Sequence, residues 1–330
     1  MTAPLDVTPA SSQAEPEASL QGVSRKAIQG RSLGQIAWMR LKRDKVAMAG
    51  GMVIIVLVLV AISAVLVDRV FGLIRPNLPH QDLIDGSTLA PKGFFGGMSS
   101  DHPLGIEPLS GRDILQRVYA GSWISLLIAV MATVLSVVIG TVMGVIAGYL
   151  GGWVDTVISR MMDIFLAFPL LVFALALAGM LNTFNVNGEG VRIAVLVFII
   201  GFFNWPYIGR IVRGQTMSLR EREFVDAARS LGARSPYILF RELLPNLIAP
   251  ILVYATLLIP TNILFEAALS FLGVGIQPPT ATWGGMISEA VAYYTLPHFM
   301  LWPGLAIFIT VLSFNLFGDG LRDALDPRAR

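Results

Sequence analysis

Side chains that could perform catalysis or bind a metal are few in this sequence and lie far apart. The 330 residues contain no cysteine, which excludes disulfides, thiolate nucleophiles and cysteine-ligated metals. The three histidines, His80, His102 and His298, are too scattered to indicate a metal site. We therefore expect no catalytic residue, no bound metal and no cofactor on this chain.

The lysines also exclude a nucleotide-binding P-loop. That motif reads G-x-x-x-x-G-K-[ST], so its lysine must follow a glycine. The only lysines are Lys26, Lys42, Lys45 and Lys92, and none of them follows a glycine. If this protein works in an ATP-driven process, the ATPase must be a different chain.

Composition indicates a protein dissolved mainly in lipid. The chain is 55% hydrophobic and only 14% charged, against about 25% charged residues in soluble domains. Mean hydropathy is +0.69. The net charge of +2 does not indicate nucleic-acid binding, because the basic residues flank apolar runs, as they do in membrane proteins.

Six apolar segments approach or exceed the roughly 20 residues that a helix needs to cross a bilayer. They are Val46–Val67, Val118–Val154 with a Gly-rich turn, Ile164–Gly188, Ile193–Gly209, Leu243–Phe265 and Ala290–Gly318. The third span is expected to begin earlier, near Asp155. We predict an all-α integral membrane protein with six transmembrane helices and both termini on one side.

The distribution of Lys and Arg sets the orientation. With the N-terminus inside, the inner segments hold 18 basic residues and the outer segments 6, so both termini are predicted to be cytoplasmic. Residues 1–23 are expected to form a disordered cytoplasmic tail. Residues 24–45 are expected to form an amphipathic helix on the membrane surface. Residues 46–70 form the first span, 71–118 an extracytoplasmic loop and 321–330 a second cytoplasmic tail.

The inner loop over residues 214–244 carries two helix signals. Ser218 and Glu221 have the spacing of a capping box, and Gly232 stands where a helix C-cap glycine would. A short helix is predicted between them, from about Arg220 to Leu231.

A second helix is predicted from Tyr237 to Leu244, because Pro236 is favoured at a first helical position. Pro245 would mark its junction with the fifth span. One interpretation of this charged hairpin is a solvated connection. The other is a docking helix, since Ala227 and Ala228 allow close approach of a partner.

The hairpin resembles the EAA loop of binding-protein-dependent ABC importers, whose pattern is E-A-A, three residues, G, nine residues, I, one residue, L-P. Asp226 takes the place of Glu and Glu242 that of Ile. The resemblance implies ATPase coupling through nine residues: Glu223, Phe224, Asp226, Ala227, Ala228, Leu231, Gly232, Leu244 and Pro245.

Four further stretches resemble the second, C-type permease of dipeptide, oligopeptide and nickel importers. They are Arg160–Pro169, Glu266–Gly284, Phe314–Arg328, and the HPLG followed by GRD within His102–Asp113. In the last stretch Ile106-Glu107 replaces the usual Thr-Asp. Together with the hairpin, the resemblance covers nearly everything after residue 24.

The resemblance implies a type I ABC importer transmembrane domain over residues 119–320 in the bacterial inner membrane. Implied partners are a second permease, two ATPase subunits or domains that hold ATP and Mg, and an extracytoplasmic binding protein. The implied cargo is a dipeptide, an oligopeptide, a nickel chelate or a related small solute.

Two acidic residues fall inside predicted spans. A lone ionised group at bilayer depth costs roughly 2.5–3.5 kcal/mol on insertion scales, so Asp163 and Glu266 should face protein or water. Each is a candidate pathway or gate residue. The alternative for each is a structural hydrogen bond or pairing with Arg160 or Arg210.

Other classes of membrane protein fit the sequence less well. A secondary transporter would show internal repeats and broken helices at mid-membrane, and no clear repeat is visible. A channel would need a filter segment, and a membrane enzyme would need a cluster of acids, bases or metal ligands. Gly140, Gly144 and Gly148 are spaced by four, which predicts close helix packing.

Overall fold

The computed structural model describes residues 33–183 and 188–326. In these residues the chain is helical, with two isolated bridges and no β-strand. The predicted tail at 1–23, residues 24–32 of the predicted surface helix and residues 327–330 lie outside the described residues. The all-α prediction is confirmed for the part that is described.

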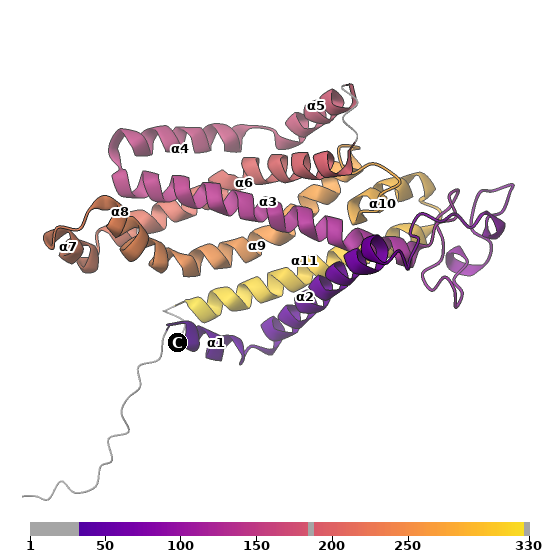
Figure 1. Ribbon diagram of the computed structural model, residues 1–330, viewed down its shortest axis with the longest axis horizontal. Coiled ribbons are helices and arrows are strands. Elements are labelled where there is room, and N and C mark those ends of the chain that lie inside the picture. Colours follow the sequence, from indigo (N-terminus) through magenta and orange to yellow (C-terminus); the bar gives the residue numbers. More distant parts are fainter. Residues whose placement is uncertain (1–32, 184–187, 327–330) are drawn as a thin grey trace, which may run out of the picture.

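The helices run along one long axis, with a looped region at one end and a helical hairpin at the other (Figure 1). Their bounds are α1 Leu33–Leu41, α2 Lys45–Ala64, α3 Ile114–Leu150, α4 Gly152–Ala167, α5 Leu170–Thr183, α6 Glu189–Arg220, α7 Glu223–Ser230, α8 Ser235–Tyr237, α9 Leu244–Phe271, α10 Trp283–Ala290 and α11 Pro297–Leu325. Short 3-10 or π turns lie at 65–70, 81–83, 94–96, 238–243 and 291–293.

Five helices of the described chain are long and apolar enough to cross a membrane, or six if one bent pair counts as a single span. The five are Lys45–Asp68, Ile114–Leu150, Glu189–Arg220, Ser235–Phe271 and Pro297–Leu325. Several of the observed helices are therefore longer than the spans predicted from the sequence. The sixth begins at Pro297 rather than Ala290, and it continues to Leu325 through part of the predicted C-terminal tail.

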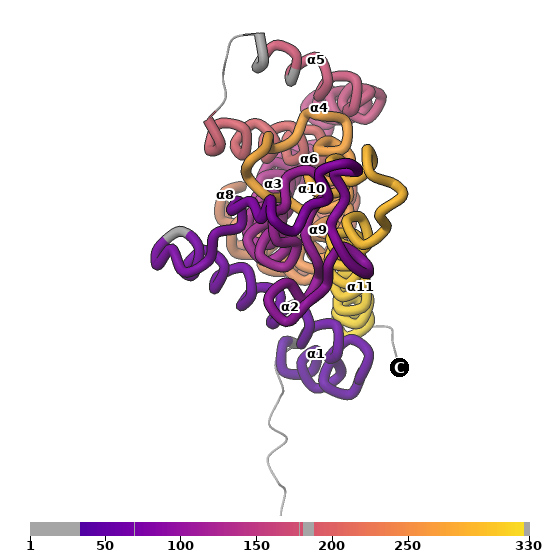
Figure 2. The backbone as a smooth tube through the Cα atoms, turned by 90° about the vertical axis from the view of Figure 1, so that its right-hand side faces the viewer, coloured from indigo at the N-terminus to yellow at the C-terminus, as the bar shows by residue number. Residues whose placement is uncertain are grey.

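The third predicted span, Ile164–Gly188, is wrong as a single helix. The chain forms α4 and α5, which are bent by 74° relative to each other. Pro169 explains the break, because a residue before proline avoids the helical region. Phe168 accordingly has φ −78° and ψ 129°. Figure 2, which looks along the bundle, shows α5 at its margin.

The loop predicted over 71–118 ends earlier, since α3 begins at Ile114. The carboxylate of Asp113 caps this helix by accepting a hydrogen bond from the backbone N–H of Gln116 at 2.8 Å. Its other oxygen lies 2.6 Å from Nδ1 of His102. The HPLG and GRD stretches are thus joined at the start of α3.

Three glycines allow α3 and α6 to pack with their backbones close together. A Cβ on Gly140 would lie 2.7 Å from the carbonyl oxygen of Trp205, and one on Gly144 would lie 2.6 Å from that of Gly209. A Cβ on Gly148 would lie 2.8 Å from the carbonyl oxygen of Arg213. The predicted packing role of this glycine stripe is confirmed.

A buried ion-pair cluster fastens the loop before α3, called the outer loop after its predicted side, to the bundle. Glu107 lies 2.5 Å from Nε of Arg112 and 2.5 Å from Nε of Arg117. Glu289 of α10 lies 2.7 Å from Arg112. The contact between Arg117 and Glu107 is an ion pair without the alignment of a hydrogen bond. Burial raises the pKa of Glu107, while Arg117 and Arg112 oppose that rise.

We predict that Gly144→Ala lowers stability by about 1–3 kcal/mol, because its methyl group overpacks the contact between α3 and α6. Gly304→Ala in α11 is the control, since a Cβ there meets nothing within 4 Å. Thermal unfolding of the purified protein in detergent measures both. An unchanged melting temperature for Gly144→Ala would show that the two helices can separate at little cost.

We predict that Arg117→Met destabilises the fold by up to about 3–5 kcal/mol at neutral pH, because Glu107 stays buried and loses one of its two arginine partners. Without Arg117 the folded pKa of Glu107 rises further, so protonation relieves the penalty as the pH falls through that value. Melting temperatures at neutral and mildly acidic pH test this. The double variant Arg117→Met with Glu107→Gln should lack the pH dependence.

Candidate functional site

The hairpin of residues 214–244, called the inner hairpin after its predicted side, stands at the end of the bundle opposite the loop that precedes α3 (Figure 1). The capping box predicted at Ser218 and Glu221 is wrong, because α6 continues in helical form to Arg220. The short helix α7 instead starts at Glu223, after an N-cap at Arg222 that makes no side-chain hydrogen bond. Continued helical hydrogen bonding in α6 has outweighed the local cap.

Gly232 ends α7 as predicted. It has φ +82°, a left-handed conformation that favours glycine. Its N–H donates to the carbonyl of Arg229, and the N–H of Ala233 donates to the carbonyl of Ala228. This pair of hydrogen bonds forms a Schellman motif, which reverses the chain.

The helix predicted from Tyr237 to Leu244 has no junction at Pro245. The chain is helical from Ser235 to Phe271, through a π turn at Ile238–Leu243. Pro245 stands in the first turn of α9, directly after the π turn. Because proline has no N–H to donate to the preceding turn, the helix continues there with one backbone hydrogen bond fewer.

Apolar packing fixes the hairpin to the inner ends of α3 and α6. Val225, Ile238 and Leu243 are fully buried together, against Tyr149 and Leu219. The guanidinium of Arg229 lies 5.9 Å from the centre of the Tyr149 ring. The hairpin is therefore packed against the helix bundle and is not a free loop.

The surface of the hairpin carries an open groove of about 660 Å³. Ala227 and Ala228 of α7 line it together with Leu231, which is 89% exposed. The lining residues are Phe224, Ala227, Ala228, Leu231, Gly232, Ala233, Arg234, Tyr237 and Glu242. An apolar surface left open in this way is typical of an interaction site.

Five of the nine predicted hairpin residues line this groove: Phe224, Ala227, Ala228, Leu231 and Gly232. The other four do not, and Asp226 instead pairs with Arg229 at 3.3 Å. Sequence reasoning missed Ala233, Arg234, Tyr237 and Glu242 as lining residues. The left-handed turn at Gly232 was the available signal, because it folds the following helix back onto α7.

Asp163 forms ion pairs on the side of the bundle between α4 and α6. Its carboxylate lies 2.5 Å from Arg210 of α6 and 3.5 Å from Arg160 of α4. All three side chains are about half exposed or more. A second pair, between Asp155 and Arg213, joins the same two helices nearer the inner end.

Glu266 is fully buried in α9 and shares no partner with Asp163. One carboxylate oxygen accepts a hydrogen bond from the hydroxyl of Ser270 at 2.9 Å. The structure therefore does not bring the two predicted pathway residues together. Asp163 lies on an open face, and Glu266 lies inside the helix packing.

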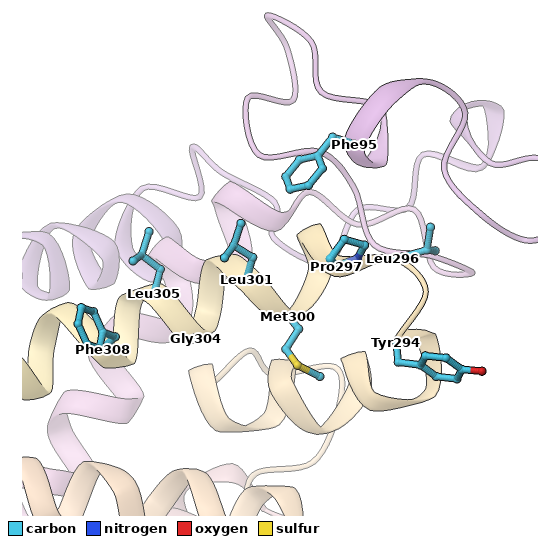
Figure 3. A pocket seen from close by; sticks show the side chains of 9 residues that line it. All are labelled: Phe95, Tyr294, Leu296, Pro297, Met300, Leu301, Gly304, Leu305 and Phe308. Atoms are coloured by element: carbon cyan, nitrogen blue, oxygen red, sulfur yellow. The ribbon is translucent and has the colours of Figure 1, made fainter.

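A second pocket of about 580 Å³ lies where the outer loop meets the start of α11. Phe95 lies above Leu301 and Leu305, and Phe308 continues along the same helix (Figure 3). The lining holds no charged side chain. In the described chain no three or more His, Asp or Glu residues gather in a way that could hold a metal ion.

Two family models match the chain. Residues 32–88 match the N-terminal TM domain of oligopeptide transport permease C. Residues 140–330 match the binding-protein-dependent transport system inner membrane component.

Similar proteins include the glutathione transport system permease protein GsiD of three bacteria. Identity is 43% for Salmonella typhimurium, 42% for Shigella flexneri serotype 5b and 40% for Escherichia coli O6:K15:H31. Each alignment covers 89% of this chain and 90% of the relative. The chain therefore belongs to the binding-protein-dependent inner-membrane permeases and is a C-type permease subunit of an ABC importer of the peptide-transport family.

Proposed function

We propose that this subunit forms half of a translocation path for a small peptide and receives the ATPase through the groove of the inner hairpin. The observation that carries the proposal is the open apolar groove between α7 and α8, at the end of the bundle where basic residues concentrate. In this proposal α4 and α5 form one broken span, which makes six. Both termini then lie in the cytoplasm.

The chemistry of the groove supports a protein partner. Ala227 and Ala228 leave the backbone of α7 accessible, while Phe224 and Leu231 offer apolar contact. Arg234 and Glu242 supply opposite charges at the same surface, which would fix the orientation of the partner. ATP and Mg would bind to that ATPase, two copies or domains of which would serve the complex.

The relatives suggest the cargo. Because the permeases at 40–43% identity are named for glutathione transport, glutathione is the first solute to test. Dipeptides, oligopeptides and nickel chelates remain in the same proposal. An extracytoplasmic binding protein would deliver the solute, and a second permease would complete the path.

We also propose roles for the two acidic residues. Asp163 lies on an open face with Arg210, which suits the wall or inner mouth of a path. Glu266 suits a gate contact, because separating the helices around it would expose a carboxylate that Ser270 now holds.

The first test is purification of the tagged chain from its native membrane. We expect a second permease and one or two P-loop ATPases to accompany it.

The Ala227→Trp variant should lose the ATPases and keep the second permease, because the indole fills the groove. Phe240→Trp is the matched control, since Phe240 is exposed on the same hairpin and lies outside the groove. A chain recovered alone that moves solute without ATP would point to a secondary transporter instead.

We predict that Gly232→Val uncouples ATP hydrolysis from transport while the chain still inserts into the membrane. A β-branched residue at φ +82° costs about 1–3 kcal/mol in backbone strain, which distorts the turn that forms the groove. ATPase and uptake rates in reconstituted vesicles measure the effect. Gly190→Val is the control, because its φ is ordinary and a Cβ there meets nothing within 4 Å. Normal coupled uptake by Gly232→Val would contradict the docking role.

A further inference from the structure

One stripe along α6 changes from buried to open partway down the helix. Leu196, Ile200, Phe203, Tyr207 and Arg210 follow at spacings of four and three, so they share a face. The first three are buried. Tyr207 is 50% exposed, and the side chain of Arg210 is 53% exposed.

An aromatic cluster closes the stripe at the level of Phe203. The ring of Phe203 lies 4.8 Å from that of Phe173 and 5.7 Å from that of Phe168, measured between centroids. Phe168 directly follows α4 and Phe173 belongs to α5, so the bend at Pro169 places both rings against α6. The face of α6 is therefore covered on the outer side of this cluster and open on the inner side.

The glycine contacts show which part of α3 lies at the same depth as this open stretch. A Cβ on Gly140 would approach the backbone of Trp205 and Gly209, and one on Gly144 would approach Gly209 and Arg213. Tyr207 and Arg210 therefore lie level with about residues 138–144 of α3.

At that depth the two helices expose opposite chemistry. The exposed side chains of α3 are Val138 at 55% and Val142 at 52%, which suit the hydrocarbon of the bilayer. An arginine in hydrocarbon costs roughly 2.5–3.5 kcal/mol on insertion scales, yet α6 exposes Arg210 there, beside the carboxylate of Asp163. The two sides of the chain thus face different surroundings at one depth.

We propose that the inner stripe of α6, from Tyr207 through Arg210 to Gly214, lines a water-filled cavity that is open to the cytoplasm and bounded outward by Phe168, Phe173 and Phe203. This rests on the proposed permease function. The stripe continues to open toward the inner end, since a Cβ on Gly214 meets nothing within 4 Å. The Tyr207 hydroxyl and the Asp163–Arg210 pair give the cavity hydrogen-bonding and charged groups suited to a polar, peptide-like solute.

The absence of cysteine makes the proposal directly testable, because single cysteines can be introduced without removing any. Tyr207→Cys is the probe. Val138→Cys and Val142→Cys are the controls, matched to it in depth and exposure. Each variant is assembled into the complete transporter in inside-out vesicles without ATP. The vesicles are then treated with a membrane-impermeant methanethiosulfonate that carries a quaternary ammonium group.

We expect Tyr207→Cys to react about ten-fold or more faster than either control, since the thiolate is the reactive form and apolar surroundings suppress it. Equal, slow reaction at all three positions would overturn the cavity, because Tyr207 would then face lipid or the second permease. Recovery of the ATPases with these same variants keeps the permease function separate. A complex that assembles and transports with an unreactive Tyr207→Cys refutes the cavity alone.

Discussion

The contact between α3 and α6 is the constraint on which the rest of the structure depends. Gly140, Gly144 and Gly148 bring the two backbones so close that a single methyl group would collide with a carbonyl oxygen. In a bilayer such van der Waals packing replaces the hydrophobic drive that joins helices in water. The contact fixes the register of α6 against α3. It thereby decides which residues of α6 are buried and where the hairpin beyond Arg220 is mounted.

The helices α4 and α5 are tied to this frame in a different way. Two ion pairs, Asp155 with Arg213 and Asp163 with Arg210, hold α4 to the inner half of α6. Beyond the bend at Pro169, α5 meets α6 through the aromatic rings of Phe173 and Phe203. Along α6, the ion pairs thus lie nearer the hairpin, and the aromatic contact lies farther from it.

Local signals predicted the features that depend on neighbouring residues, and they failed where distant residues decide. The αL glycine at Gly232 and the glycine stripe were readable, because one turn and one helical period define them. The length of α6 could not be predicted from the sequence. Arg210 and Arg213 look like the end of a span, yet helical hydrogen bonding continues past them to Arg220. The capping signal at Ser218 was lost for the same reason. Glu242 and Tyr237 reach the groove only because the chain reverses at Gly232, so that turn is the local signal for them and their own residue types are not.

One end of the molecule buries its charged groups in ion pairs, whereas the other leaves an apolar groove exposed, and α3 runs between them. At the outer end Arg117 of α3 is buried with Glu107 of the loop, so charge is satisfied internally. At the inner end Tyr149 of α3 lies in the base of the hairpin, which leaves its own groove open to a partner. The helix between them has 37 residues without a break, a length of about 55 Å at 1.5 Å per residue. One unbroken helix therefore carries both Arg117, which binds the loop, and Tyr149, which supports the hairpin.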